Sequence, residues 1–302
     1  MFRTVLVMLL FGMASATAFG APPDTGPAAK AAETPEQILV AALAQSIGPP
    51  ARANIGDQAT VRLKDQLAFI PRAPAARLLA VSNVSVPTDF QGLLLGSEGM
   101  EMPGLIRYVP AGFIDSDAAL AWTADDFLSS LRDTVAHGNP ARVSQNVEER
   151  EARRWVQAPR YSPEAHQLSW AALILPKSAP RESDGEVTFR AIGFGRNGYI
   201  ELTVVTSLEK TAEIGQMADS FLEGLTFRPG RAYGDVLPAD KRAPGGLAAA
   251  MGLDSLHKAR YGSDFLNSDT VIPVVGGIVA AIGALSLFIY IQRHLRREAR
   301  RG

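Results

Sequence analysis

The chain contains no cysteine among its 302 residues, and this absence excludes several classes of chemistry. Without thiols there is no cysteine nucleophile, no thiolate metal site and no disulfide to stabilise a domain. The 31 acidic residues balance the 30 Lys and Arg, so the chain has no basic excess for contacting the phosphates of a nucleic acid. We therefore expect no nucleic-acid partner and a domain that is held together by its hydrophobic core alone.

Motifs for metal binding and hydrolysis are also missing. The four histidines, His137, His166, His257 and His294, are too far apart for a helical metal-binding pair. The Gly-x-Ser-x-Gly pattern, which places a nucleophilic serine on a sharp turn, does not occur either. We expect no metal and no cofactor.

The N-terminus has the pattern of a secretory signal peptide. A positive start precedes an uncharged apolar run over residues 4–13, and small residues favour cleavage after Ala16 or Ala18. We interpret residues 1–18 as the signal peptide and the Ala- and Pro-rich residues 19–35 as a flexible leader. An uncleaved anchor is the alternative, although a run of ten residues is short for a bilayer.

A second membrane signal lies near the C-terminus, over residues 271–291. These 21 residues carry no charge, and at about 1.5 Å per residue their helix crosses a hydrocarbon core of about 30 Å. Five arginines and one glutamate follow in residues 292–302, a basic tail that the positive-inside rule places in the cytoplasm. The sequence predicts a single-pass protein of the inner (cytoplasmic) membrane whose main domain faces the periplasm or exterior. A buried core helix is the alternative.

Small residues recur every four positions in this segment, at Gly276, Ala280 and Ala284. Such a stripe lets two helices approach closely, which predicts a homodimer in addition to the lipid bilayer as a partner. The alternative is that Gly and Ala are simply common in membrane spans.

Residues 36–237 have the patterning of one α+β domain, an antiparallel sheet with flanking helices. Capping patterns at 34–37 and 123–126 mark two helix starts, and the apolar spacing over 211–225 predicts a third helix. Between them, four apolar runs within 154–206 predict consecutive strands in an antiparallel meander.

Residues 238–270 are poorly periodic and contain Gly, Ala and Ser. We interpret them as a juxtamembrane stalk that joins the domain to the span. A short helix over 247–256 is an alternative for part of this segment.

Residues Gly193–Gly198 match the dinucleotide-binding pattern G-x-G-x-x-G letter for letter. That pattern needs a helix after it, because the phosphates meet the free N–H groups of a helix N-terminus. Here the strand-like run Tyr199–Val205 follows instead. We therefore predict a β-hairpin with its turn at Asn197–Gly198.

Aromatic and titratable side chains are concentrated in one stretch and form a candidate binding surface. Its members are Trp155, Tyr161, His166 and Trp170, and we add Arg196 at the tip of the predicted turn, for which a solvated loop arginine is the alternative. In the alternative interpretation, Trp155 and Trp170 pack on the sheet as core residues.

The same region resembles the DUF2167 family, which are predicted membrane-anchored bacterial proteins of unknown function. The resemblance extends over residues 57–270, and this chain departs from the family with Phe194 where Leu is usual and with Val187–Phe189 where an Asn–Tyr pair is frequent. It implies the same topology and supplies no catalytic or binding residues. The matching segments are Gly112–Ala118, Trp155–Tyr161, His166–Ala171, Gly193–Gly198 and Phe227–Tyr233.

Three functions are compatible with these patterns. The first is a non-enzymatic module that binds another envelope protein. The second is an envelope enzyme, for which Asp115, Asp117, His166 and Arg196 are the polar candidates, provided that the fold brings His166 close to an acid. The third is a sensor that signals through the span, which would need a separate partner because the tail has no signalling domain.

Overall fold

The computed structural model describes residues 33–64, 67–81, 86–96, 99–144 and 146–250. Contacts divide the chain after Glu33, and the helices and strands described below belong to the second unit, which starts at Thr34. The predicted signal peptide, span, tail and small-residue stripe lie outside the described residues. Within the described ranges, no helix is both long enough and apolar enough to cross a membrane.

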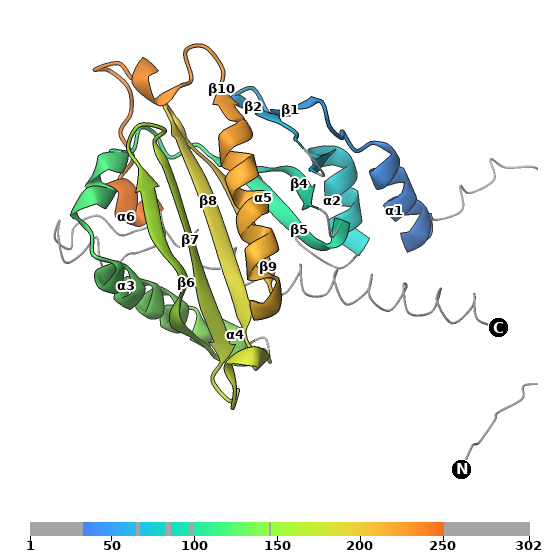
Figure 1. The fold of residues 1–302 in the computed structure, drawn as a ribbon, viewed down its shortest axis with the longest axis vertical. Coiled ribbons are helices and arrows are strands. Elements are labelled where there is room, and N and C mark those ends of the chain that lie inside the picture. The colour runs from blue at the N-terminus through green and yellow to red at the C-terminus, as the bar shows by residue number, and fades with distance from the viewer. Residues whose placement is uncertain (1–32, 65–66, 82–85, 97–98, 145, 251–302) are drawn as a thin grey trace, which may run out of the picture. The chain divides into compact units, whose positions relative to one another are not determined.

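Seven antiparallel strands form the main sheet, in the spatial order β3-β4-β5-β9-β8-β7-β6 (Figure 1). The strands β6 to β9 pair in the order in which they occur in the chain, which confirms the predicted meander. The bounds are β3 (Ala68–Pro71), β4 (Phe90–Gly96), β5 (Gly99–Val109), β6 (Arg150–Ser162), β7 (Gln167–Pro176), β8 (Glu186–Gly195) and β9 (Gly198–Thr206).

A second sheet has three short antiparallel strands in the order β1-β2-β10. They are β1 (Arg52–Ile55), β2 (Ala59–Arg62) and β10 (Leu225–Phe227). In β2 apolar and polar residues alternate, a pattern that is typical of a strand. β10 has three residues and follows a helix directly, so it is too short for its own pattern to show.

Helices cover both faces of the main sheet (Figure 1). One core cluster joins α5 and the small sheet to one face. On the other face, α3 and α6 pack over the β6–β8 end, while α1 and α2 pack over the β3–β5 end. The helices are α1 (Pro35–Ala44), α2 (Arg72–Val81), α3 (Ala124–His137), α4 (Asn139–Ser144), α5 (Thr211–Gly224) and α6 (Gly246–Ala250), with 3-10 turns η1 (Ser116–Ala121), η2 (Glu182–Asp184), η3 (Leu208–Lys210) and η4 (Tyr233–Asp235).

The predicted helix starts are confirmed by their caps. The Thr34 hydroxyl accepts a hydrogen bond from the Gln37 N–H at 3.2 Å, and the Gln37 side chain accepts one from the Thr34 N–H at 2.9 Å. The Thr123 hydroxyl likewise accepts from the Asp126 N–H at 3.1 Å. Each cap satisfies N–H groups that the first helical turn leaves without a partner, so each capping pattern determines a helix boundary.

The hairpin between β8 and β9 is also confirmed, but its turn lies one residue earlier than predicted. Gly195 pairs with Gly198, which leaves Arg196 and Asn197 as the two loop residues. Of these four residues, only Gly198 has a positive φ, of 147°. A Cβ at that position would lie 2.0 Å from the main-chain oxygen of Val109, so the glycine is needed for a close approach of two backbones.

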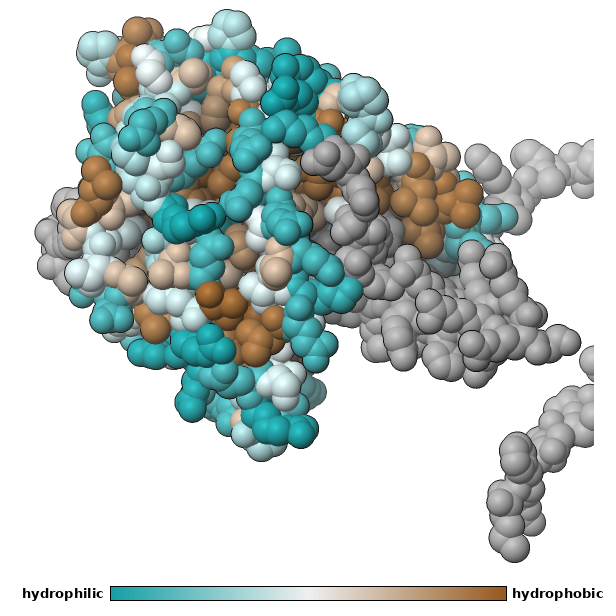
Figure 2. All heavy atoms as spheres, viewed as in Figure 1, coloured by the Kyte–Doolittle hydropathy of each residue, from teal (hydrophilic) through white to brown (hydrophobic). Residues whose placement is uncertain are grey.

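Packed structure continues beyond residue 237. Leu247 and Ala248 in α6 are each 2% exposed and belong to the core cluster beneath α3. Residues 251–270 of the predicted stalk lie outside the described residues. On the face shown in Figure 2, apolar side chains form small separate groups among polar ones.

Candidate functional site

The two tryptophans of the predicted surface pack together in the core under α3. Their ring centroids are 5.7 Å apart, and Phe127 contacts both rings. Trp155 is half-buried and its Nε1 donates to the Ala124 oxygen at 2.9 Å. Trp170 is only 2% exposed, and its Nε1 has no hydrogen-bond partner among the described residues. Trp170 is therefore a core residue and cannot contribute to a binding surface.

A buried ion pair lies beside Trp170. The Arg190 guanidinium is 5.5 Å from the Trp170 ring centroid and pairs with the Glu201 carboxylate across β8 and β9. Burial alone would raise the pKa of Glu201, but the charge and hydrogen bonds of Arg190, with Arg107 and Thr203, bring it below its usual range. This pair keeps two charges satisfied inside the fold, and its burial makes it a structural feature rather than a contact site.

Tyr161 and His166 do come together, and three further residues join them. We name Ser116, Asp117, Tyr161, His166 and Tyr233 the hydroxyl–imidazole cluster. Tyr161 and His166 flank the β6–β7 turn, Ser116 and Asp117 begin η1, and Tyr233 begins η4. Segments far apart in the chain therefore meet at one point.

Hydrogen bonds connect the cluster around the Tyr161 hydroxyl. That hydroxyl donates to Asp117 Oδ1 at 2.5 Å and lies 2.8 Å from Ser116 Oγ. Its single hydrogen goes to the carboxylate, which can only accept, so the Tyr161 oxygen accepts from Ser116. His166 Nδ1 lies 3.5 Å from both hydroxyls. The Tyr161 hydroxyl thus lies between the His166 ring and the Asp117 carboxylate. The enzyme hypothesis required that His166 lie close to an acid in this way.

Tyr233 completes the cluster from the other side of His166. The two rings are stacked, with centroids 3.7 Å apart and planes 19° apart. The Tyr233 hydroxyl accepts a hydrogen bond from the Ser116 N–H at 3.1 Å. One face of the imidazole is therefore covered, while His166 and Tyr161 as a whole remain half-buried.

His166 adopts an uncommon backbone conformation, with φ of 50°. Its carbonyl oxygen accepts a hydrogen bond from the Phe194 N–H at 3.0 Å, which fixes the turn against β8. A non-glycine residue in this region costs on the order of 1–3 kcal/mol, although His tolerates it better than most. The positive φ belongs to the β6–β7 turn, which positions the His166 ring beside the Tyr161 hydroxyl.

The exposure of each group limits the chemistry of the cluster. Ser116 is 0% exposed, so no substrate reaches its hydroxyl as a nucleophile. Burial, and then the hydrogen bond to Asp117, raise the pKa of Tyr161, which keeps it a protonated donor at neutral pH. Asp117 and the neighbouring Asp115 are exposed, and Asp115 makes no cap hydrogen bond to η1. The cluster offers recognition groups rather than an activated nucleophile.

Arg196 lies in the β8–β9 turn and is held there. Its guanidinium makes two hydrogen bonds to the Asp240 carboxylate, at 2.7 and 2.8 Å. The hydrogen bonds from Arg196, and next the one from the Leu237 N–H, lower the pKa of Asp240 to about 2. Arg196 therefore anchors a downstream segment and is not a free anion-binding group.

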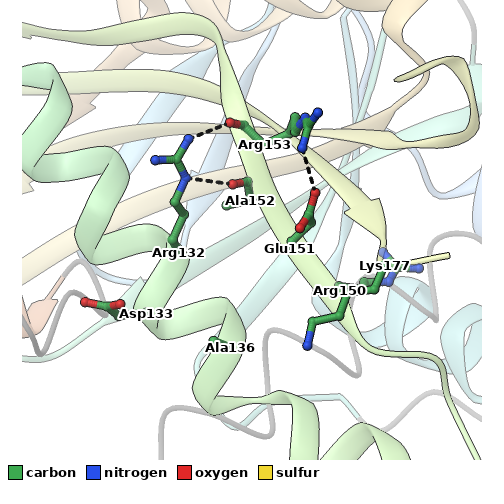
Figure 3. A pocket seen from close by; sticks show the side chains of 8 residues that line it. All are labelled: Arg132, Asp133, Ala136, Arg150, Glu151, Ala152, Arg153 and Lys177. Atoms are coloured by element: carbon green, nitrogen blue, oxygen red, sulfur yellow. Dashed lines mark hydrogen bonds and ion pairs between the residues drawn. The ribbon is translucent and has the colours of Figure 1, made fainter. Parts of the chain in front are cut away.

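A shallow hollow of about 430 Å³ lies between α3 and the start of β6 (Figure 3). Four cations line it, and each already has a partner. Arg132 donates to the main-chain oxygens of Ala152 and Arg153. The other three pair with carboxylates: Arg150 with Glu186, Arg153 with Glu151 and Lys177 with Glu149. An anion would have to compete with these partners, so the hollow is a weaker candidate than the cluster.

The sequence analysis did not single out Ser116 and Tyr233 of the hydroxyl–imidazole cluster, or Asp240, which pairs with Arg196. Ser116 and Tyr233 lie within segments that match DUF2167, but neither residue type signals a site by itself. Within the described part of the chain, no three His, Asp or Glu side chains are placed to hold a metal ion.

Fold and site together define an α+β domain of antiparallel sheets with flanking helices and a half-exposed polar cluster. The chain belongs to the family described as "Protein of unknown function (DUF2167)", which matches residues 49–261. No curated protein matches the sequence. The solution structure of cyanobacterial PsbP (CyanoP) from Synechocystis sp. PCC 6803 is similar, at 9% identity and a TM-score of 0.34, over 61% of this chain and 92% of that chain. So low a score supports no argument about function.

Proposed function

We propose that this DUF2167 protein is a membrane-anchored binding module of the bacterial envelope. In this proposal the described domain faces the periplasm or exterior, and the hydroxyl–imidazole cluster contacts another envelope protein. The anchor rests on the charge-free segment over 271–291 and the arginine-rich tail. The recognition role rests on the cluster itself.

The observation that carries the binding role is the combination of order and exposure in the cluster. Tyr161 and His166 are half-buried, Asp117 is exposed, and hydrogen bonds hold all three in place before any partner arrives. Preorganised aromatic side chains with a polar edge lose little entropy on binding, which is why Tyr is frequent at the energetic centres of interfaces.

An envelope enzyme is the second candidate, favoured by the short path from Asp117 through Tyr161 to His166. Two findings weigh against it. Ser116 is buried, and Tyr161 is held in its protonated form. His166 alone would remain as a general base, without a positioned nucleophile.

Site-specific photo-crosslinking in cells tests the binding role with the full chain. A photoreactive residue replaces Asp115, which is exposed beside the cluster, or Asp133, a matched exposed acid at the hollow. We expect a discrete adduct with another protein from position 115 and none from position 133. Tyr161→Phe should lower the yield at position 115 by about tenfold, because it removes the hydrogen bond to the Asp117 carboxylate that holds the cluster in place before a partner binds.

The proposal fails if position 115 gives no adduct, or if positions 115 and 133 give the same one. It also fails if Tyr161→Phe leaves the yield unchanged in a variant whose melting curve matches that of the wild type.

A further inference from the structure

Residues 232–248 follow β10 in the chain and contain η4 and the start of α6, and we name this segment the C-terminal strap. It starts at a bridge between Ala232 and Gly195 and ends in α6, where Leu247 and Ala248 are buried. The predicted stalk, residues 238–270, overlaps the strap, and the predicted span follows later in the chain. The strap therefore lies in the last described part of the chain before the proposed anchor.

The strap is fastened by the same short loop that builds the cluster. Phe113 donates its N–H to the Lys241 oxygen and accepts from the Ala243 N–H, both at 2.8 Å. Three and four residues later, at the start of η1, Ser116 and Asp117 bond to Tyr161. A displacement of this loop thus affects both the strap and the cluster.

The loop lies so close to the strap that a side chain at position 112 would clash with the strap backbone. Gly112 has φ of 94°, and a Cβ there would lie 2.6 Å from the Lys241 oxygen. The Arg242 guanidinium lies 5.0 Å from the centroid of the Phe113 ring, which in turn contacts Tyr233. The contact between loop and strap is therefore tight and continuous rather than a single bond.

Two further contacts close the connection. Tyr233 belongs to the strap and to the cluster at once, through its stack on His166 and its hydrogen bond from Ser116. Asp240 is bonded twice by Arg196, which fixes the middle of the strap to the β8–β9 turn. Ser116 and His166 thus contact the strap residue Tyr233 directly, and Tyr161 and Asp117 reach it through them.

We infer that the cluster and the C-terminal strap form one cooperative unit, so that a partner held at the cluster changes how firmly the strap is docked. This inference rests on the proposed function only in naming the cluster as the contact. Coupling of this kind is reciprocal: whatever loosens one end must loosen the other. It gives an occupied cluster a physical route towards the proposed anchor.

Hydrogen exchange of the purified full chain in detergent, resolved to single amides, tests the coupling without a ligand. The reporters are the Ala243 N–H for the strap and the Ser116 N–H for the cluster. Arg196→Gln weakens the strap, and we expect both amides to exchange on the order of tenfold faster. Tyr161→Phe weakens the cluster at a residue outside the strap, and we expect the Ala243 amide to exchange faster as well.

Arg154→Gln is the matched control, because it removes a guanidinium that also makes a double contact with a carboxylate, that of Glu182 in η2. It should leave both reporters unchanged. If Arg196→Gln fails to fold, Asp240→Asn removes the same ion pair and keeps the arginine.

The coupling is overturned if Arg196→Gln or Asp240→Asn accelerates the Ala243 amide while the Ser116 amide stays within about twofold of the wild-type rate. Absence of a crosslinked partner would overturn the proposed function and leave the coupling intact. If a partner is crosslinked but the two amides exchange independently, the coupling is overturned and the proposed function stands.

Discussion

At the scale of single residues, His166 has two properties that substitution can separate. Its backbone lies in the left-handed region, and its ring stacks on Tyr233 beside two hydroxyls. The first property concerns the stability of the β6–β7 turn. The second concerns recognition at the cluster.

His166→Asn and His166→Val both remove the ring, but they differ in backbone tolerance. Asn adopts positive φ readily, whereas a β-branched residue does so rarely. We expect the valine variant to be less stable than the asparagine variant by about 1–2 kcal/mol, measured as free energy of unfolding in urea. Equal stability of the two variants would show that the left-handed turn is not maintained in solution.

The sequence predicted part of the cluster, for physical reasons that can be named. Tyr161 and His166 lie five positions apart on one hairpin, so local pattern alone brought them together. Ser116 and Tyr233 reach the cluster only through the packing of η1 and η4, and no local rule contains that information. Trp170 was a surface candidate in one interpretation, but both faces of β7 are covered, and Trp170 lies on the face that packs under α3.

At the scale of elements, the pair between Arg196 and Asp240 makes the docking of the strap depend on pH. Because the hydrogen bonds of Arg196 lower the pKa of Asp240 to about 2, below the value of about 3.9 for an unfolded chain, the folded state favours the charged carboxylate. The stabilisation is therefore fully present above about pH 4 and is lost as the pH falls through about 2.

Melting temperatures of the wild type and of Asp240→Asn check this dependence. We expect the difference between them to be constant from pH 7 to pH 5 and to fall to about half by pH 3. Asp219→Asn, at the exposed ion pair with Arg160, serves as the control. A difference that stays constant down to pH 3 would contradict the assignment of the lowered pKa to this pair.

Elements with strong local signals were predicted, and those made by tertiary contacts were not. Capping residues at Thr34 and Thr123 located two helices, and the apolar runs located the meander. β10 was missed because its pairing with β2 gives it its strand conformation. The turn of the β8–β9 hairpin was misplaced by one residue. Gly198 pairs with Gly195 as the first residue of β9 and lies close to the Val109 backbone, so the loop consists of Arg196 and Asn197.

At the scale of the whole molecule, the proposed function depends on the orientation of the domain relative to the membrane. A cluster that recognises an envelope protein must face the compartment in which that protein lies. The arginine-rich tail predicts that the domain and the C-terminus are on opposite sides of the bilayer. The coupling of cluster and strap gains a role in the cell only if this orientation holds.

Labelling with a membrane-impermeant maleimide measures the orientation directly, because the chain has no cysteine and a single introduced thiol is the only target. Ser129→Cys places that thiol at an exposed position on α3, and Gly302→Cys places it in the predicted tail. We expect the thiol at position 129 to be labelled in intact spheroplasts, and the one at position 302 only after the membrane is permeabilised. Protection of position 129 until permeabilisation would contradict the proposed orientation.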